Sequence, residues 1–202
     1  MTDTTAEPRR PGRPRSEKAQ AAILAAAIEL LLEQGLQAMS MDVVAKRAGV
    51  SKATIYRWWP SKDVLALDAL ATEWQVAGHA ATIDTGSLRG DLLARFRPWL
   101  RQLRQKPYGR VVAGLVAKAQ ADPAFAELYR ERFVRPRRDA TRPILQRAIE
   151  RGEVAAGIDI EVALDLIYGP VYHRMLHGHA PLDERFARNV VDTALAGIAP
   201  RR

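Results

Sequence analysis

The chain has 202 residues, enough for one ordinary domain or for a small domain joined to a larger one. It carries 31 Lys and Arg against 23 Asp and Glu, and the formal net charge of +8 favours a polyanionic partner. The absence of cysteine excludes disulfides, thiolate metal sites and a cysteine nucleophile. We find no secretory signal and no run of about 18 apolar residues. We therefore expect a soluble, cytoplasmic protein that does not contact a membrane.

The first 15 residues are rich in Thr, Pro and Arg and show no hydrophobic periodicity. Such a segment cannot offset the entropy lost on ordering, so we expect residues 1–15 to form a flexible basic arm. From Ser16 the apolar residues recur at spacings of three and four as far as Gly35, which predicts a helix that ends at this glycine. Three short helices should follow, each beginning at a serine that can cap exposed backbone N–H groups: Ser40, Ser51 and Ser61.

Longer helices are predicted in the rest of the chain, which lacks the alternation of a β-strand. Pro136 and Pro143 lie within one of the apolar patterns, so we expect one long helix that is kinked by proline. The short helix that begins at Ser61 should extend to about residue 80. The longer helices should cover residues 87–105, 108–121, 123–151, 160–178 and 183–198.

Residues 41–48 predict an amphipathic helix followed by a sharp turn. Gly49 can adopt the left-handed backbone of that turn, Val50 can fill the space between two helices, and Ser51 can cap the second helix. The apolar residues of the first helix fall at spacings of three and four and form one buried stripe: Met41, Val44, Ala45 and Ala48.

The second helix of this pair, about residues 52–58, should bury Ile55 and one or both of Trp58 and Trp59, which lie on the same face. The exposed side chains would mix cations, a hydroxyl, a small residue and an aromatic ring, which suits a helix in the major groove of DNA. An alternative interpretation is the solvated face of an ordinary short helix; the motif that precedes the helix favours DNA binding. The exposed set comprises Lys52, Ala53, Thr54, Tyr56 and Arg57.

The segment Ser40–Leu70, SMDVVAKRAGVSKATIYRWWPSKDVLALDAL, resembles the DNA-binding segment of the TetR family of transcriptional regulators. The resemblance implies that Tyr56 and Lys62 contact backbone phosphates and set affinity rather than sequence preference. Many members have a histidine after the tyrosine, whereas this chain has Trp58, which lies either in the core or along the DNA backbone. The predicted DNA contacts are Arg13, Arg15, Ser40, Met41, Ser51, Lys52, Ala53, Thr54, Tyr56, Arg57, Trp58 and Lys62.

The stretch Arg10–Arg15, RPGRPR, resembles the Gly-Arg-Pro core of arms that enter an AT-rich minor groove. A narrow groove concentrates negative potential, and an extended arginine flanked by proline can reach into it. A solubilising tail is the alternative. The position directly before a helix-turn-helix favours DNA contact.

The segment from about Arg130 to Gly178 resembles the C-terminal domain of TetR/AcrR regulators. We therefore predict an all-α protein: an N-terminal three-helix DNA-binding domain with a helix-turn-helix, residues 16–62, followed by a larger helical ligand-binding and dimerisation domain, residues 63–202. Large aromatic residues of the middle helices either line an effector pocket or fill the core. The candidates for the pocket are Trp74, Trp99, Tyr108, Phe125, Tyr129, Tyr168 and Tyr172, with Phe133 beside them.

The last two predicted helices have wide apolar faces. Two such helices can pair with those of a second copy as a four-helix bundle with twofold symmetry, and the resemblance favours this homodimer over packing on the chain's own core. The predicted interface residues are Leu166, Val171, Met175, Phe186, Val190, Ala194, Leu195 and Ile198.

Two further clusters carry weaker predictions. His173 and His177 are four residues apart, a spacing that permits a metal pair, but no nearby cysteine or carboxylate completes a ligand set, so we predict no metal and no cofactor. Five arginines could attract an acidic effector if some point inward, although such a run is usually solvated: Arg95, Arg97, Arg101, Arg104 and Arg110.

The chain lacks a nucleophile elbow, a phosphate-binding glycine loop and a dinucleotide fingerprint, so an enzyme is not predicted. The leading hypothesis is a sequence-specific repressor that binds double-stranded operator DNA and is released by a small-molecule effector. An architectural DNA-binding protein without an effector is the alternative. A helical binding module or enzyme whose basic charge is incidental is a third hypothesis. An architectural protein would not need about 120 residues of helical domain behind its DNA-binding motif.

Overall fold

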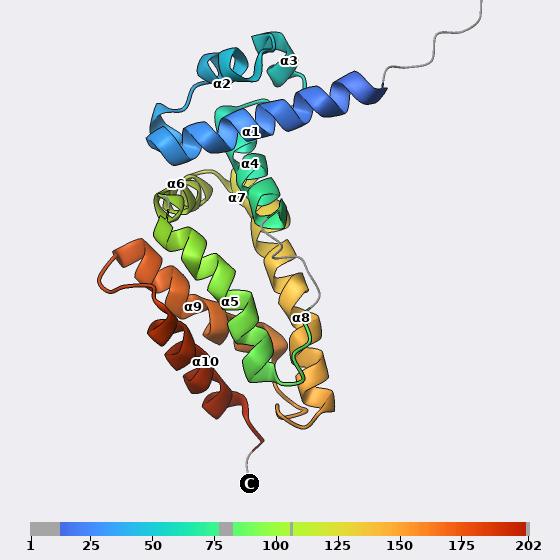
Figure 1. The fold of residues 1–202 in the computed structure, drawn as a ribbon, viewed down its shortest axis with the longest axis vertical. Coiled ribbons are helices and arrows are strands. Elements are labelled where there is room, and N and C mark those ends of the chain that lie inside the picture. Colours follow the sequence, from blue (N-terminus) through green and yellow to red (C-terminus); the bar gives the residue numbers. More distant parts are fainter. Residues whose placement is uncertain (1–12, 77–82, 106, 201–202) are drawn as a thin grey trace, which may run out of the picture.

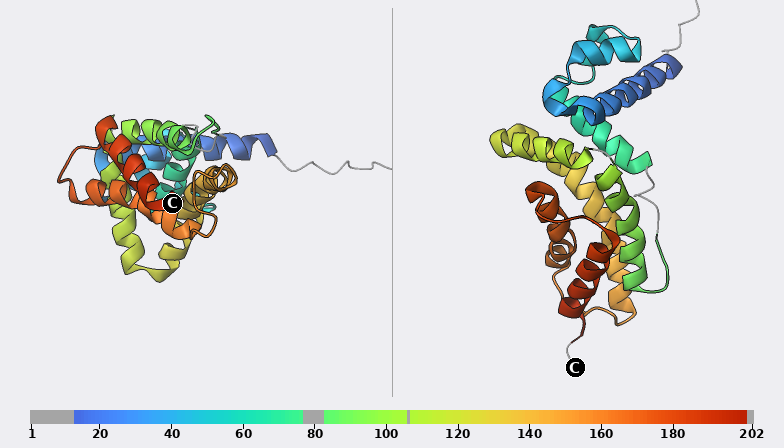
Figure 2. Two further views of the ribbon diagram at one scale, coloured as in Figure 1. Left: turned by 90° about the horizontal axis from the view of Figure 1, so that it is seen from below. Right: turned by 60° about the vertical axis from the view of Figure 1, so that its left-hand side comes forward.

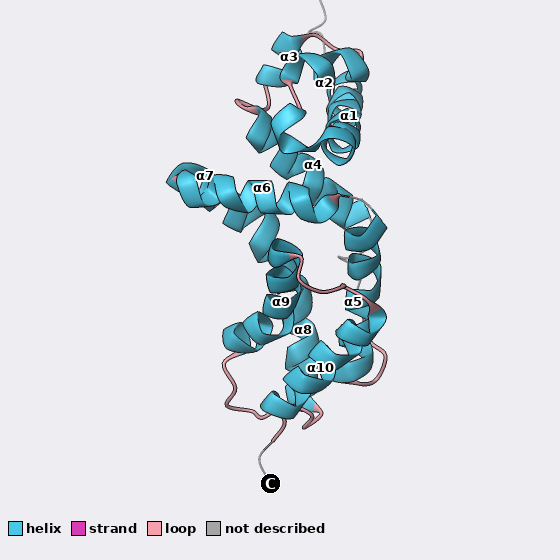
Figure 3. Cartoon of the chain, turned by 90° about the vertical axis from the view of Figure 1, so that its left-hand side faces the viewer, coloured by secondary structure: helices cyan, strands magenta, loops and turns pink. Residues whose placement is uncertain are grey.

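The computed structural model describes residues 13–76, 83–105 and 107–200, and within these ranges it contains helices and no strand (Figure 3). The predicted all-α class is therefore confirmed for the described part. In chain order the helices are α1 (Arg13–Ala38), α2 (Met41–Ala48), α3 (Lys52–Tyr56), α4 (Lys62–Val76), α5 (Leu88–Gln105), α6 (Tyr108–Ala121), α7 (Pro123–Tyr129), the π-helical η1 (Arg130–Val134), α8 (Arg135–Glu150), α9 (Ile160–His177) and α10 (Glu184–Ile198).

Helix α1 crosses one end of the molecule, with α2 and α3 on its outer side and α4 leading away from it (Figure 1). Its apolar stripe is fully buried at Ile23, Ala27 and Leu30. By length and composition alone, the segment Glu17–Ala38 could span a membrane. The apolar stripe of this segment packs against α2, α4 and α6.

Gly35 interrupts α1 with φ 80° and ψ 170°, a backbone conformation that favours glycine. The helix was predicted to end here, but one more turn follows and extends to Ala38. The helix also begins at Arg13 rather than at Ser16, so the last three residues of the expected arm are helical. Residues 1–12 of that arm lie outside the described residues.

Helices α6 and α7 lie crosswise between helices α1 to α4 and the bundle that α5, α8, α9 and α10 form (Figure 3). They share one hydrophobic core with α1 to α4 that includes Ile23, Leu70, Val111 and Phe133. The predicted domain boundary at residues 62 and 63 falls at the beginning of α4. Because α4 buries its apolar side chains in this core, the boundary does not separate two independent cores.

One continuous helical run extends from Pro123 to Glu150 and contains a π-helical turn at Arg130–Val134. The sequence predicted a single helix that is kinked by proline. Pro136 cannot donate the backbone hydrogen bond of an α-helix, and the π turn lies immediately before it. The wider turn accommodates the irregularity, so the run continues instead of ending.

Helices α5, α8, α9 and α10 form the lower bundle around a second core (Figures 1 and 2). Phe96 on α5, Ile167 on α9 and Val191 on α10 are fully buried in it. Helix α10 packs against both α5 and α9. The bundle therefore uses the apolar face of α10 within one protomer.

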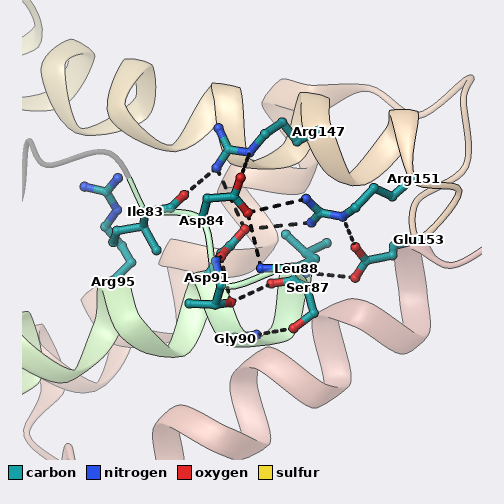
Figure 4. Close-up of polar contacts among 12 residues, drawn as sticks. Ile83, Asp84, Ser87, Leu88, Gly90, Asp91, Arg95, Arg147, Arg151 and Glu153 are labelled. Atoms are coloured by element: carbon teal, nitrogen blue, oxygen red, sulfur yellow. Dashed lines mark hydrogen bonds and ion pairs between the residues drawn. The ribbon is translucent and has the colours of Figure 1, made fainter.

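A buried carboxylate attaches the loop before α5 to the far end of α8. Asp91 is fully buried and accepts hydrogen bonds from the backbone N–H and the hydroxyl of Thr85, at 2.6 and 2.8 Å. Its second oxygen lies 3.8 Å from both Arg147 and Arg151, which point toward it in Figure 4. Arg147 also donates to the carbonyl of Ile83. These contacts hold the loop against α8 at the end of the bundle that is remote from α3.

Candidate DNA interface and internal cavity

The helix-turn-helix geometry follows from three local signals in the sequence. The hydroxyl of Ser40 accepts a hydrogen bond from the N–H of Val43 at 3.3 Å, and the hydroxyl of Ser51 accepts one from Thr54 at 3.1 Å. Gly49 has φ 66° and ψ 33°, the left-handed conformation that the turn requires. The capping serines and the glycine have the local roles that the sequence predicted.

Helix α3 buries one face and exposes the other. Ile55 is fully buried and Trp59 is 2% exposed, whereas Tyr56 is 48% exposed. Lys52, Ala53 and Arg57 are exposed as well. The predicted recognition face is therefore accessible to the major groove of DNA.

A hollow of about 490 Å³ lies where α1, α2, α3 and α4 meet beside this face. Five of the predicted DNA contacts line this hollow. They come from α2, α3 and α4 and from the serine that caps α2. The backbone N–H groups at the beginning of α2 also lie at this place, and a helix N-terminus favours a phosphate. The five predicted contacts that line the hollow are Ser40, Met41, Lys52, Tyr56 and Lys62.

Two ion pairs set the charge around the motif. Lys52 donates to Asp42 at 3.0 Å, and this hydrogen bond with its charge attraction raises the pKa of Lys52. Arg47 makes two bonds of 2.9 Å to Glu33, which attach α2 to α1. The contact with Asp42 therefore partly neutralises the charge that Lys52 presents to a phosphate, while its remaining N–H donors face solvent.

The structure gives Lys62 a role different from the predicted phosphate contact. Its ammonium group donates to the carbonyls of Leu36, Gln37 and Met39 at 3.2, 3.0 and 3.2 Å. A lysine has three N–H donors, and all three are used here. Lys62 therefore neutralises the negative end of α1 and fixes α4 to it.

Two other predicted DNA contacts are buried or half-buried. Met41 is 6% exposed, so its side chain belongs to the core and only its backbone faces outward. Trp58 is half-buried against the same core, with the guanidinium of Arg57 stacked 4.7 Å from its ring centroid. Arg13 and Arg15 lie in the first turn of α1, and their side chains are outside the described part of the structure.

A cavity of about 270 Å³ lies between α4, α5 and the helices from α6 to α9. Tyr108 and Phe125 do not line it; they are packed in the core, 1% and 4% exposed. Val116, Val134 and Leu176 complete its apolar wall. Five of the seven aromatic candidates line the cavity: Trp74, Trp99, Tyr129, Tyr168 and Tyr172.

Of the five arginines that could attract an acidic effector, only Arg95 is buried and lines the cavity, where it donates to the carbonyl of Ala140 at 2.7 Å. The other four are exposed. Two arginines of α8 that the sequence did not single out, Arg137 and Arg138, also line the cavity. Arg138 is paired with Glu161 and Asp165.

A polar link connects the recognition motif to the turn beside the cavity. The indole N–H of Trp59 donates to Asp68 of α4 at 2.8 Å. Arg132 of η1 donates to both oxygens of the same carboxylate, at 2.9 and 3.0 Å. The next two residues of η1 are Phe133, which is buried, and Val134, which lines the cavity.

Most residues of the predicted dimer interface are buried within one protomer. Five of them are at most 8% exposed and therefore offer little area to a partner: Val171, Phe186, Val190, Ala194 and Ile198. They fill the chain's own core, which was the alternative left open by the sequence. Leu166 is 51% exposed, and Met175 and Leu195 are partly buried.

The exposed face of α9 carries the remaining apolar surface. Val162, Leu166 and Leu176 are 53%, 51% and 45% exposed. At 100° per residue they fall within one face of the helix, together with Gly169 and His173, which are also exposed. Large apolar side chains on one exposed face mark a surface that another molecule covers.

Three histidines lie close together at the end of α9 and just after it. The rings of His173 and His177 lie 4.6 Å apart, and that of His179 lies 5.2 Å from His173. Across the described ranges, however, no group of three or more His, Cys, Asp or Glu side chains is arranged to hold a metal ion.

A helix-turn-helix with an exposed recognition face, joined to a larger helical domain with an internal cavity, defines a class of DNA-binding proteins. Comparison with known proteins identifies the family. Residues 23–69 match the model for bacterial regulatory proteins of the tetR family, and residues 82–194 match that for the tetracyclin repressor-like C-terminal domain. The chain belongs to the TetR family of transcriptional regulators.

Individual relatives agree with this assignment along the whole chain. An uncharacterized HTH-type transcriptional regulator, YdeS of Bacillus subtilis (strain 168), is 38% identical over 93% of this chain and 93% of its own length. The DNA-binding transcriptional repressor TetR of Mycobacteroides abscessus is 32% identical over 90% of this chain and 94% of its own length. The crystal structure of the TetR family transcription regulator SCO0332 superposes with a TM-score of 0.79 and 37% identity, covering 91% of this chain and 100% of that one.

The role of Lys62 leads to a testable prediction. Replacing it in Lys62→Met should lower the free energy of unfolding by about 2 kcal/mol, because three carbonyls lose hydrogen bonds from a charged donor. Urea denaturation measures this loss. The exposed Lys46→Met is the matched control and should stay within about 0.5 kcal/mol of the wild type. The opposite result would be unchanged stability together with a slope of log DNA affinity against log salt concentration that is smaller by about one. That result would support the phosphate contact implied by the family resemblance.

Proposed function

We propose that this protein is a cytoplasmic, homodimeric repressor that binds a specific operator and is released from it by a small-molecule effector in the internal cavity. DNA binding and transcriptional regulation are properties of the family. The observation that supports the effector role is the position of η1. This turn borders the cavity and is also connected, through Asp68, to the recognition motif. Val134 of this turn lines the cavity, and Arg132 of the same turn is bonded through Asp68 to Trp59.

This arrangement supports a mechanism in which α4 transmits the effector's presence. Helix α4 begins at Lys62, which is bonded to the end of α1, and carries Trp74 in the cavity wall. An effector that displaces Trp74 or η1 therefore tilts α4 and moves the motif attached to it. A helix-turn-helix dimer with twofold symmetry contacts two DNA half-sites about 34 Å apart. A shift of a few ångströms in the separation of the recognition helices therefore misaligns both of them.

The effector must bind the displaced state more tightly than the DNA-binding state. A tenfold preference supplies about 1.4 kcal/mol per site. Linkage then requires that operator DNA weakens effector binding by the same factor.

The homodimer is proposed to form through the exposed face of α9. Val162, Leu166 and Leu176 would meet their counterparts around a twofold axis, and exposed Gly169 allows the two helices to approach closely. Burial of these side chains removes apolar area from water, which is the main source of free energy for such association.

Footprinting on genomic DNA at several salt concentrations tests the regulatory role. We expect protection of a discrete pseudo-palindromic site that persists at salt concentrations where non-specific binding is lost. Uniform coverage of the DNA would instead indicate the architectural protein. An effector found by thermal-shift screening should then bind about tenfold more weakly when that operator is present, as measured by calorimetry.

The link through Asp68 can be tested by its removal. In Asp68→Asn the charged acceptor for Trp59 and Arg132 is lost, so we expect effector binding to remain while the ratio of effector affinities without and with operator falls toward one. The control is Asp192→Asn, which breaks an exposed Asp–Arg pair of α10 and should leave the ratio unchanged. A normal ratio in Asp68→Asn would show that the coupling follows another route.

The proposed dimer surface has its own test. Leu166→Glu places a charge on the exposed face of α9 next to its symmetry mate, so we expect a folded monomer by light scattering and circular dichroism. Because a monomer contacts the operator with one recognition helix instead of two, its operator affinity should be at least tenfold lower. Ala124→Glu, on the exposed surface of α7, should remain dimeric. A dimeric Leu166→Glu protein would exclude this face as the interface.

A further inference from the structure

The cavity contains a buried cation whose hydrogen-bonding capacity is not satisfied. Arg137 of α8 is 8% exposed, and its Nη1 donates to the carbonyl of Phe133 at 2.6 Å. Its Nε and Nη2 are buried, and in the described part of the chain neither makes a hydrogen bond of good geometry; the neighbouring hydroxyl of Tyr108 is also buried and makes none. An arginine remains protonated in proteins, so both groups are charged donors.

The surroundings of Arg137 hold the guanidinium in place without neutralising it. The guanidinium carbon lies 3.4 Å from the ring centroid of Phe133 and 4.6 Å from that of Trp74. Aromatic ring faces attract a cation, but they do not accept the hydrogen bonds that the Nε and Nη2 of the guanidinium direct within its own plane. The group is therefore oriented and still lacks an acceptor.

No acidic side chain is among the described residues that line the cavity. The tyrosines cannot supply a negative charge, because burial raises the pKa of Tyr129, Tyr168 and Tyr172. Burial also raises the pKa of Tyr108 to about 12. Neighbouring Arg138 is already paired with carboxylates of α9, so its acidic partners are not available to Arg137. Burial lowers the pKa of Arg137, with Tyr108 and Tyr172 opposing the shift.

We propose that the effector is a small amphipathic carboxylate whose anionic group binds the Nε and Nη2 of Arg137 while its apolar body lies against Trp74, Trp99 and Tyr172. This inference rests on the proposed effector role of the cavity and adds the chemical class of the ligand. A carboxylate matches the planar fork of a guanidinium through two parallel bonds. The volume of about 270 Å³ is at the lower end of ligand pockets, which favours a small acid.

Matched pairs of acids and amides test the ligand class in the full-length wild-type protein. The probes are phenylacetate with phenylacetamide, naphthoate with naphthamide, and decanoate with decanamide. Binding is measured by the fluorescence of Trp74 and Trp99 in the cavity wall and by calorimetry, without DNA. We expect at least one acid to bind about 10- to 100-fold more tightly than its amide, as charged hydrogen bonds to a buried donor imply.

Variants at Arg137 separate this role from a merely structural one. Arg137→Met should remove the preference for the acid, so that acid and amide of each pair bind alike. Arg137→Lys keeps a charge but not the fork, and should retain a reduced preference. Arg101→Met removes an exposed arginine of α5 outside the cavity and should bind as the wild type does. Melting temperatures establish that each variant is folded.

The outcomes distinguish the ligand class from the proposed function. The proposal is overturned if no acid of the panel binds, if amides bind as tightly as acids, or if Arg137→Met and Arg137→Lys keep the full preference. Amides that bind equally and still release operator DNA would overturn the ligand class and leave the ligand-released repressor intact. Acids that bind through Arg137 without releasing DNA would support the ligand class and contradict release.

Discussion

The carboxylate of Asp68 accepts bonds from two parts of the molecule that are far apart in sequence. Trp59 belongs to the end of the helix-turn-helix, and Arg132 belongs to the π turn of the long helix that borders the cavity. Because Asp68 lies on α4, movement of α4 against η1 changes its contact with Arg132. These directed bonds add to the apolar packing, which is not directional, in setting the position of the recognition motif relative to the larger domain.

The π turn that supplies Arg132 has a local cause. Pro136 lacks the N–H that would bond to the preceding turn, and π-helical turns within α-helices frequently occur at functional sites. Here the turn places Arg132 toward α4 and Val134 toward the cavity. A regular helix would rotate these side chains to other directions. The backbone irregularity and the proposed coupling thus have the same origin in the sequence.

Much of the architecture was predictable because it depends on local chemistry. The caps at Ser40 and Ser51 and the left-handed Gly49 follow from residue type alone. The surfaces against which the helices pack could not be predicted in this way. Periodicity shows that a helix has an apolar face, but it does not show which surface covers that face. For this reason the apolar residues of α10 were assigned to a dimer, although they fill the protomer's own core. Likewise, Arg137 gave no signal, since arginines are exposed by default and its burial follows from tertiary packing.

Energies of ordinary size are sufficient for the proposed regulation. A hydrogen bond to a charged group contributes about 1.5–3 kcal/mol, and allosteric coupling between two sites is typically about 1–3 kcal/mol. Solvent screening limits the partly exposed pair of Asp68 and Arg132 to about 1 kcal/mol or less. In the proposed mechanism, weakening this pair together with the bond from Trp59 to Asp68 would supply a coupling of the required size, without a large rearrangement of either core. The two cores can remain close-packed in both states, and the change is confined to α4, η1 and the cavity wall. In the proposed mechanism, a cavity of modest volume in a small domain would thus control the spacing of two recognition helices.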